Sequence, residues 1–242
     1  TATDAAGNSN FDELNFTWDT TAPTAALTGV PTGTNNSTAL AIDVGGTGVA
    51  AYKHKVGADA SIDCTNSSGY SVETVEATNI TDVISGVADG AVELCVVAKD
   101  AAGNWQAYSS ATVRTWTKDT TPPTATTSGQ PSGSSNALAL NIDIAGADVV
   151  AYRFAKGIGT LDCNDIGNYG SETSAGTNIT DSVAAIGDGT VKVCVIGKDT
   201  AGNWQSTLGP TSVTWTKDTV PPTVDVGDQV SFTGLYRPPV NR

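Results

Sequence analysis

The sequence predicts an all-β protein built from tandem antiparallel β-sandwiches arranged end to end. Three observations lead to this prediction: a long internal repeat, apolar residues that alternate with a period of two, and frequent turn signals. No stretch carries an apolar stripe at helical spacing. The 242 residues are enough for two domains of ordinary size, each with its own core.

The repeat has a period of 100 and then 99 residues, measured between Asp19, Asp119 and Asp218. Each of these residues opens a Thr- and Pro-containing junction. The late motif Lys-Asp-Ala-Ala-Gly-Asn-Trp-Gln at 99–106 returns, with one Ala changed to Thr, at 198–205. We therefore expect complete repeats at 18–117 and 118–216. Residues 1–17 match the last strands of a truncated repeat, and residues 217–242 match the start of a further, incomplete one.

Strands are expected where apolar and polar residues alternate, because one face of each strand is then buried. In the first repeat these stretches are 22–29, 38–44, 48–56, 79–85, 91–98 and 105–116, and those of the second repeat follow about 100 residues later. One run in the second repeat consists of Leu138, Leu140, Ile142 and Ile144, separated by Ala139, Asn141 and Asp143. Asp89-Gly90 and Asp188-Gly189 are strong hairpin signals, since Gly accepts a positive φ.

The junction at 119–124 and the corner Asp-Ala-Ala-Gly-Asn at 100–104 resemble those of bacterial immunoglobulin-like repeats. Such repeats occur in very large secreted and cell-surface proteins of the adhesin type. The resemblance covers nearly the whole chain and implies immunoglobulin-like sandwiches. It says little about the molecular role, because repeats of this kind serve as stalks, adhesins and appendages of enzymes.

Each repeat contains two cysteines at a spacing of 31 residues: Cys64 and Cys95, then Cys163 and Cys194. Equal spacing within each repeat predicts one disulfide per repeat and therefore an oxidising compartment. Alternation places Cys95 on the face opposite the apolar residues at 92, 94 and 96. The bridge should then fasten the loop after 48–56 to the outer face of its sheet rather than cross the core.

Acidic residues at the junctions and corners are candidate calcium ligands, because Ca²⁺ prefers carboxylate and carbonyl oxygens. The candidates are Asp19, Asp100, Asp119, Asp199 and Asp218. In the alternative interpretation each of these carboxylates accepts hydrogen bonds from local turn amides, with neighbouring lysines as partial counterions. The sequence contains no dense calcium-binding motif, and both interpretations stay open. No other cofactor is expected.

Composition excludes several classes of function. The net charge is −13, with no cluster of Lys or Arg, which argues against nucleic acid and anionic membranes as partners. No apolar run is long enough to span a membrane. The single His54 is replaced by Phe154 in the second repeat, and no Gly-x-Ser-x-Gly motif occurs. We therefore expect packing roles for these residues and no enzymatic activity.

Tryptophans recur at two places in the repeat. Trp105 and Trp204 follow the corner, and Trp18, Trp116 and Trp215 precede the junctions. They predict either an aromatic platform that stacks on sugars or packing at the sandwich edge and at the junction. Because each recurs at a fixed place, packing is the favoured interpretation.

These observations predict a non-enzymatic structural segment, such as a stalk, fibre or adhesin rod, that is secreted or exposed on a cell surface. Two adjacent prolines should stiffen the junctions. Expected partners are neighbouring repeats, further copies of the chain in a fibre, and host or surface glycans. The alternatives are a carbohydrate-binding module, accessory repeats of a secreted hydrolase, and a filament subunit assembled by strand exchange.

Overall fold

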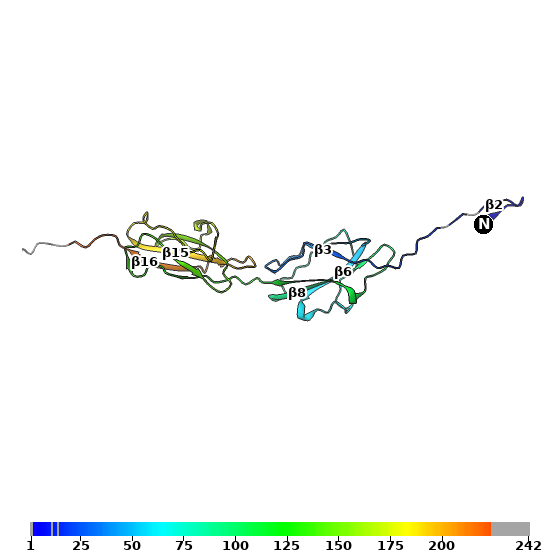
Figure 1. Cartoon of the computed structure of the whole chain (residues 1–242), viewed down its shortest axis with the longest axis horizontal. Helices are drawn as coiled ribbons and strands as arrows, with labels where there is room; N and C mark the ends of the chain where they lie inside the picture. The colour runs from blue at the N-terminus through cyan, green and yellow to red at the C-terminus, as the bar shows by residue number, and fades with distance from the viewer. Residues whose placement is uncertain (1, 11, 14, 224–242) are drawn as a thin grey trace, which may run out of the picture.

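The computed structural model describes residues 2–10, 12–13 and 15–223. As predicted, its regular structure is almost entirely β, and the strands form two sandwiches (Figure 1). The first contains β3, β6 and β8, and the second contains β15 and β16. In the described residues the helical elements are three short 3₁₀ turns: η1 (Asp59–Ser61), η2 (Tyr108–Ser110) and η3 (Ile166–Asn168).

The first sandwich pairs a five-stranded sheet with a smaller one. The order in the large sheet is β4-β9-β8-β6-β7, and β3 pairs with β5 in the small sheet. The strands are β3 (Ala26–Thr28), β4 (Thr34–Asn35), β5 (Asp43–Gly45), β6 (Ala51–Ala58), β7 (Thr74–Val75), β8 (Gly90–Lys99) and β9 (Thr112–Lys118). Isolated bridges from Ala39 to Val83 and from Ile42 to Ile80 extend the small sheet.

The core lies between these sheets and follows the predicted alternation. Val92, Leu94 and Val96 on β8 are fully buried and pack with Ile42 and Tyr52. Burial of an aliphatic side chain of this size contributes about 1.5–3 kcal/mol, so these contacts dominate the stability of the sandwich. The Tyr52 hydroxyl donates to the Thr78 carbonyl at 2.5 Å, which satisfies its one buried polar group.

The second sandwich repeats this arrangement. The large sheet has the order β11-β16-β15-β13-β14, and β10 pairs with β12. The strands are β10 (Thr126–Ser128), β11 (Ser134–Ser135), β12 (Asp143–Ala145), β13 (Ala151–Ile158), β14 (Thr173–Ser174), β15 (Gly189–Lys198) and β16 (Thr211–Lys217). Two layers with this strand order are what the resemblance to immunoglobulin-like repeats implied.

Two short strands join the large sheet at places that the sequence did not indicate. β4 pairs parallel with the end of β9, in the register Thr34 with Thr117, and β11 pairs with β16 in the same way. Both stretches are polar and only two residues long, so they carry no alternation from which a strand could be predicted. They attach the beginning of each repeat to its last strand.

The strand predicted at 105–116 is wrong in its first half, because regular pairing begins only at Thr112. Trp105 forms a single bridge to Lys99, and the chain then turns through η2. The reason is the buried Gln106 side chain, whose Oε1 accepts from the Ala98 amide at 3.2 Å. Its Nε2 donates to the Ser110 carbonyl, so one side chain holds the turn together.

Two further predictions need correction. The stretch 79–85 contributes isolated bridges rather than a regular strand. In the second repeat, Leu138 is 44% exposed, whereas Leu140, Ile142 and Ile144 are buried as expected. Its carbonyl nevertheless accepts the Val183 amide at 2.8 Å, so the backbone of Leu138 is paired while its side chain stays outside the buried core.

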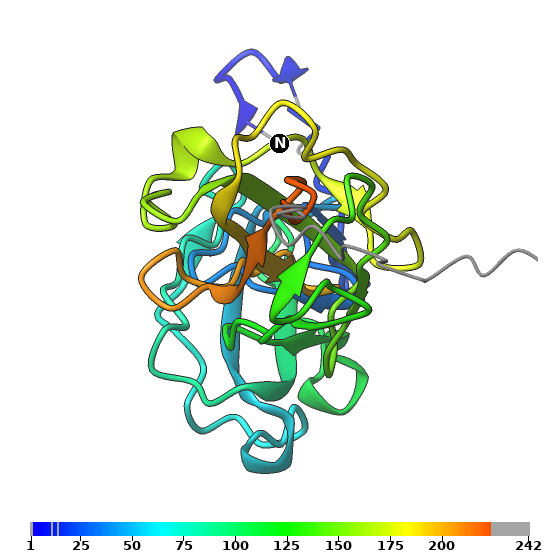
Figure 2. The ribbon, with the colours of Figure 1, turned by 90° about the vertical axis from the view of Figure 1, so that its left-hand side faces the viewer.

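Near the N-terminus, β1 (Ala2–Thr3) pairs with β2 (Ser9–Asn10). This pair stands apart from the other strands in both views of the molecule (Figures 1 and 2). Most of the further repeat expected at 217–242 lies outside the described residues. No helix within the described part of the chain is long and apolar enough to cross a bilayer.

Candidate functional site: the junction between the sandwiches

The junction begins where β9 ends and consists of Asp119, Thr120, Thr121 and two prolines. The Asp119 carboxylate accepts the Thr121 amide at 3.0 Å, which forms a local turn. Pro122 and Pro123 then fix φ near −65°. The linker therefore has little conformational freedom of its own before any contact with the sandwiches is counted.

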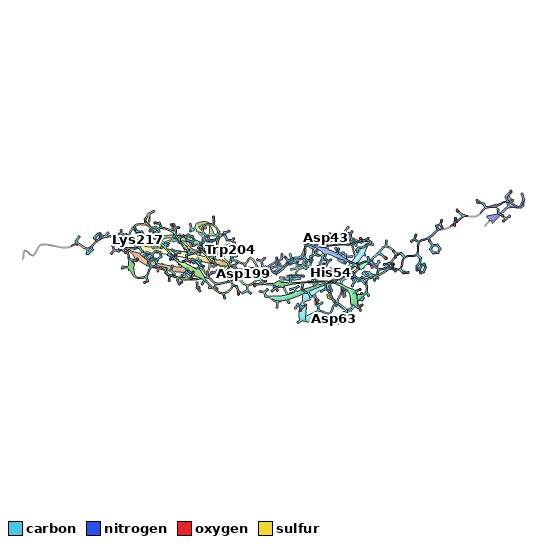
Figure 3. The ribbon with its side chains drawn as sticks, viewed as in Figure 1. Asp43, His54, Asp63, Asp199, Trp204 and Lys217 are labelled. Carbon is cyan, nitrogen blue, oxygen red and sulfur yellow. A yellow bond between two sulfur atoms is a disulfide. The ribbon has the colours of Figure 1, made fainter. Side chains whose placement is uncertain are left out.

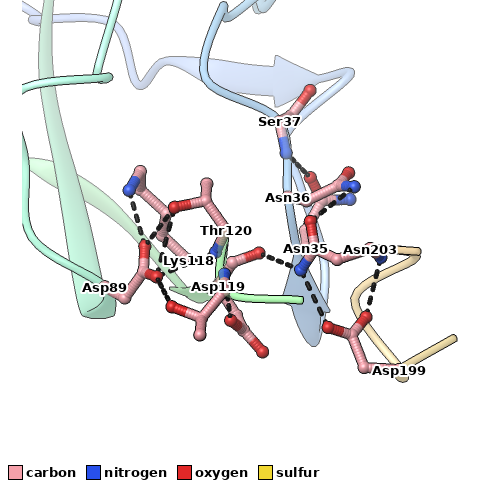
Figure 4. A network of polar contacts seen from close by, with 10 residues as sticks. Asn35, Asn36, Ser37, Asp89, Lys118, Asp119, Thr120, Asp199 and Asn203 are labelled. Carbon is pink, nitrogen blue, oxygen red and sulfur yellow. Dashed lines mark hydrogen bonds and ion pairs between the residues drawn. The ribbon is translucent and has the colours of Figure 1, made fainter. Parts of the chain in front are cut away.

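On the upstream side, Asp89 holds the linker. Its carboxylate accepts the Lys118 ammonium at 2.7 Å, the Thr120 amide at 2.9 Å and the Thr121 hydroxyl at 3.0 Å (Figure 4). The Lys118 ammonium and the Thr120 amide hold the pKa of Asp89 well below its usual value. Because the Lys118 side chain is almost fully buried, Asp89 is the counterion that makes its burial tolerable.

On the downstream side, Asn203 reaches back to the linker. Its Nδ2 donates to the Asp119 carbonyl at 2.9 Å and to the Asp199 carboxylate at 2.9 Å. Its Oδ1 accepts from Asn36 Nδ2 of the first sandwich at 3.1 Å (Figure 4). Gly202 adopts φ +99°, which the tight corner before Asn203 requires. The junction is thus bonded to both sandwiches.

The same two sets of contacts occur at the other ends of the repeats. Asn104 donates to the Asp19 carbonyl at 3.0 Å, as Asn203 does to Asp119. Asp188 accepts Lys217 at 3.1 Å and the Thr219 amide at 3.0 Å, as Asp89 does with Lys118 and Thr120. Each repeat therefore binds the linker before it through an Asn and the linker after it through an Asp.

The predicted calcium candidates are distributed over three junctions. Asp119 and Asp199 meet at one of them through Asn203, Asp19 and Asp100 meet at the preceding one through Asn104, and Asp218 lies at the next. All five carboxylates accept hydrogen bonds from local amides, as the alternative interpretation describes. Among the described residues, the one group of three or more metal-ligand side chains is Cys64, Glu93 and Cys95.

Both cysteine pairs are joined as disulfides, with Cα atoms 5.5 Å apart for Cys64–Cys95 and 5.8 Å for Cys163–Cys194. Cys95 is fully buried on the outer face of its sheet. Each bridge fastens the loop after β6 or β13 to that face. In the second repeat the bridge forms a small additional core with Ala155, Leu161 and Tyr169. Two disulfides indicate an oxidising environment.

The tryptophans have three kinds of surroundings. Trp116 and Trp215 are buried in the two cores, whereas Trp18 is 81% exposed. Trp105 and Trp204 are half-buried on the outer faces. Cations from the same sheet pack against both rings, at 4.7 Å from Lys53 to Trp105 and from Arg153 to Trp204. These contacts give Trp105 and Trp204 structural partners within their own repeats.

His54 is buried between two polar side chains of its own sandwich. Its Nε2 lies 3.0 Å from Asp82 Oδ2, and its Nδ1 lies 3.3 Å from Ser71 Oγ. The Ser71 hydroxyl also donates to the Val72 carbonyl at 2.9 Å. The cluster joins β6 to Ser71 on one side and to Asp82 on the other. This is a packing role.

The sequence did not single out several residues whose side chains bond segments that are distant in the sequence. Gln106, Asp89 and Lys118, with their counterparts Gln205, Asp188 and Lys217, were treated as parts of motifs and turns. The available signal was that each recurs at a fixed place in both repeats. A buried Lys cannot be distinguished from an exposed one by alternation at the end of a strand.

The chain matches neither a family model nor a curated protein. It is similar to several solved structures. The fibronectin(III)-like modules of Clostridium thermocellum CbhA match with 16% identity over 80% of this chain and 93% of that chain, at a TM-score of 0.44. A tetra-tandem repeat in the extending region of a large adhesion protein matches with 20% identity over 90% and 55%, at 0.37. The FN1–FN3 domains of chicken CNTN1 match with 12% identity over 81% and 66%, at 0.27.

Proposed function

We propose that this chain is a non-enzymatic structural segment, a stalk or adhesin rod, of a bacterial secreted or cell-surface protein. In this proposal the sandwiches stand end to end and hold whatever lies beyond them at a fixed distance. The supporting observation is that the linker is bonded on both sides, to Asp89 of the first sandwich and to Asn203 of the second.

The positions of these contacts within a repeat favour a straight arrangement. Asp199, beside the upstream contact, and Lys217, beside the downstream contact, lie at opposite ends of the second sandwich (Figure 3). A repeat that is held at opposite poles by equivalent contacts continues the direction of the one before it. Short linkers with adjacent prolines preserve that direction better than flexible ones.

The remaining features suit a segment that is exposed outside the cell. The disulfides tie each large loop to a sheet and so limit local unfolding. The net charge of −13 disfavours sticking between neighbouring copies along most of the surface. Adhesion at a distance from the cell is the biological purpose that we propose for such a rod.

Small-angle scattering of the full chain tests this proposal. We expect an elongated particle whose scattering fits one rigid body. Replacing Asp89 by Asn, which keeps an acceptor for Lys118, and Asn203 by Ala should give a broader distribution of shapes, while thermal melts show that both sandwiches remain folded. Asn136→Ala, at an exposed site of the second repeat, serves as the control. A compact particle, or wild-type scattering as broad as that of the double variant, would contradict the rod.

A further inference from the structure

The two disulfides have opposite charges beside them. In each repeat the strand that carries the second cysteine, β8 or β15, also carries a charged residue two places before it, on the same outer face. This residue is Glu93 in the first repeat, and its carboxylate lies within 4.8 Å of the sulfur atoms of Cys64 and Cys95. In the second repeat it is Lys192. The same kind of bridge therefore lies beside an anion in one repeat and beside a cation in the other.

The charge next to a disulfide affects how readily it exchanges with a thiol. In this reaction an attacking thiolate bonds to one sulfur atom, and the other sulfur leaves as a thiolate. A nearby cation stabilises the leaving thiolate, and a nearby anion destabilises it. Cys95, beside Glu93, is therefore the poorer leaving group, and Cys194, beside Lys192, is the better one.

A cation near the first bridge does not cancel the effect of Glu93. Lys55 lies opposite Cys95 in the sheet. Its ammonium donates to three loop carbonyls at 2.6, 2.8 and 3.2 Å, those of Asp63, Asn66 and Ser68. A Lys ammonium has three protons, so these bonds leave none for a thiolate at Cys95.

The cation near the second bridge is bonded differently. Among the described residues, the Lys192 ammonium donates to one group, the Leu161 carbonyl, at 3.1 Å. Leu161 packs against Cys163 and Cys194 in the small outer core, so the ammonium is held at the edge of that core. Two of its protons are not used by this bond and can be donated to a thiolate at Cys194.

The remaining charges near the bridges do not reverse this difference. Burial and the nearby Asp59 carboxylate raise the pKa of Glu93 in the first repeat, although the Lys55 ammonium opposes them. The loop carboxylates of the second repeat are Asp162 and Asp165. Both accept amides of local turns at exposed sites. The first bridge therefore has the more negative surroundings.

Accessibility selects the sulfur atom that is attacked. Cys95 and Cys194 are fully buried, whereas Cys64 is 9% exposed and Cys163 is 6% exposed. An external thiol therefore reaches the loop cysteine of each pair, and the strand cysteine leaves. Figure 3 shows Asp63, which precedes Cys64, at the side of the first sandwich rather than at its junction with the second. Because exposure is nearly equal in the two repeats, charge is what distinguishes them.

We propose that the Cys163–Cys194 bridge is a modification site for small-molecule thiols, whereas the Cys64–Cys95 bridge is a structural bond that resists them. The thiol loses its proton to solvent, and its sulfur bonds to Sγ of Cys163 as a mixed disulfide. The Cys163–Cys194 bond breaks, and Cys194 leaves as a thiolate that Lys192 stabilises. One S–S bond replaces another, so the exchange needs no oxidant or reductant besides the thiol.

Exchange also opens the second loop more fully than it would open the first. The three bonds from Lys55 hold the first loop to its sheet whether or not the bridge is intact. Its place in the second repeat is taken by Ala155, which contributes apolar surface instead. Opening this loop uncovers Ala155, Leu161 and Cys194 on the side of the sandwich. The junction contacts are not involved, so this proposal does not depend on the rod.

The test is exchange of the full chain with 2-mercaptoethanol, an uncharged thiol, followed by alkylation and mass spectrometry. The mixed disulfide at Cys163 should form at least about tenfold faster than the one at Cys64. Lys192→Gln should remove most of this difference, and Lys192→Arg should keep it. Lys198→Gln, on the same face of β15, removes an equal charge farther from the bridge and is the matched control. Thermal melts show that each variant remains folded.

Exchanging the two charges gives the sharpest comparison. The double variant Glu93→Lys with Lys192→Glu should reverse the order of the two bridges. Equal rates at the wild-type bridges, faster exchange at Cys64, or an order unchanged in the double variant would overturn the proposal. A mixed disulfide at Cys194 would overturn the assignment of the leaving sulfur. The urea-unfolded chain should show a much smaller difference, and a full tenfold difference there would show that the fold is not its cause.

Discussion

The two repeats agree at their ends and differ on their sides. Both keep the Asp–Lys–Thr contacts at the downstream junction, the Asp–Asn corner at the upstream junction, the buried Gln and the disulfide. Nearly all of these contacts hold a linker, a turn or a loop. What both copies share is therefore mainly the means of connecting and bracing a sandwich.

Most of the differences lie on exposed or loop-facing surfaces, and the buried His54 is an exception. His54 becomes Phe154, Glu93 becomes Lys192, and the exposed valines at 72, 75 and 83 become serines. Even the cation that fills the disulfide loop comes from different strands: Lys55 on β6 donates to the Asp63 carbonyl, whereas Lys192 on β15 donates to the Leu161 carbonyl. Surfaces that connect repeats are kept, and surfaces that face outward can become specific to one repeat.

Removing one disulfide should produce the largest difference between the repeats. Cys64→Ala with Cys95→Ala opens a loop of about 32 residues and should lower the free energy of unfolding of the first repeat by about 3–4 kcal/mol. Denaturation of the full chain should then show two transitions, with the second repeat unchanged. The matched pair Cys163→Ala with Cys194→Ala should reverse the order. A single transition that shifts as a whole would show that the repeats unfold together.

The buried glutamines should have the next largest effect. Gln106→Ala leaves the amides of Ala25 and Ala98 without their acceptor and should cost about 2 kcal/mol in the first repeat. Gln205→Ala should cost a similar amount in the second repeat, where Ala125 and Gly197 lose theirs. Chemical denaturation monitored by circular dichroism measures both. A change below a few tenths of a kcal/mol would mean that water replaces the side chain.

Acid should lower the stability of the first repeat through Asp89. Its pKa is lowered in the folded protein, so the ionised form stabilises the fold. That stabilisation is complete above the unfolded-state pKa, near 3.8, and decreases as the pH falls below it toward the folded-state pKa. Urea denaturation at pH 5 and pH 2.5 should show a smaller acid-induced loss in Asp89→Asn than in the wild type. Equal losses would place the acid sensitivity in other carboxylates.

The sequence predicted the architecture well because burial leaves a periodic record. Alternation at 91–98 identified β8 and its buried face, and equal cysteine spacing suggested the two bridges that the structure contains. The pairing of β4 with β9 left no such record, since it depends on backbone hydrogen bonds between polar residues. Sheet position, rather than residue type, decides whether a stretch of that kind becomes a strand.

The junction was predicted in outline only. The repeated Asp and Pro residues marked its place, and carboxylates there suggested calcium as one of two interpretations. The contacts that hold the linker come from Asp89 and Asn203, which are distant from it in the sequence. Only the fold brings them together, so no local motif could have identified them as partners.

The smallest expected effect concerns the one hydrogen bond that joins side chains of the two sandwiches among the described residues. Asn36→Ala removes the donor to Asn203 Oδ1, while Asn203 keeps its bonds to Asp119 and Asp199. Unfolding should change by less than about 0.5 kcal/mol, because Asn36 is exposed. Residual dipolar couplings should nevertheless show more independent alignment of the two sandwiches than in the wild type. Asn136→Ala, the equivalent change in the second repeat, should leave their alignment as it is. If both variants align like the wild type, the linker contacts at Asp89 and Asp119 alone are enough to set the angle between the repeats.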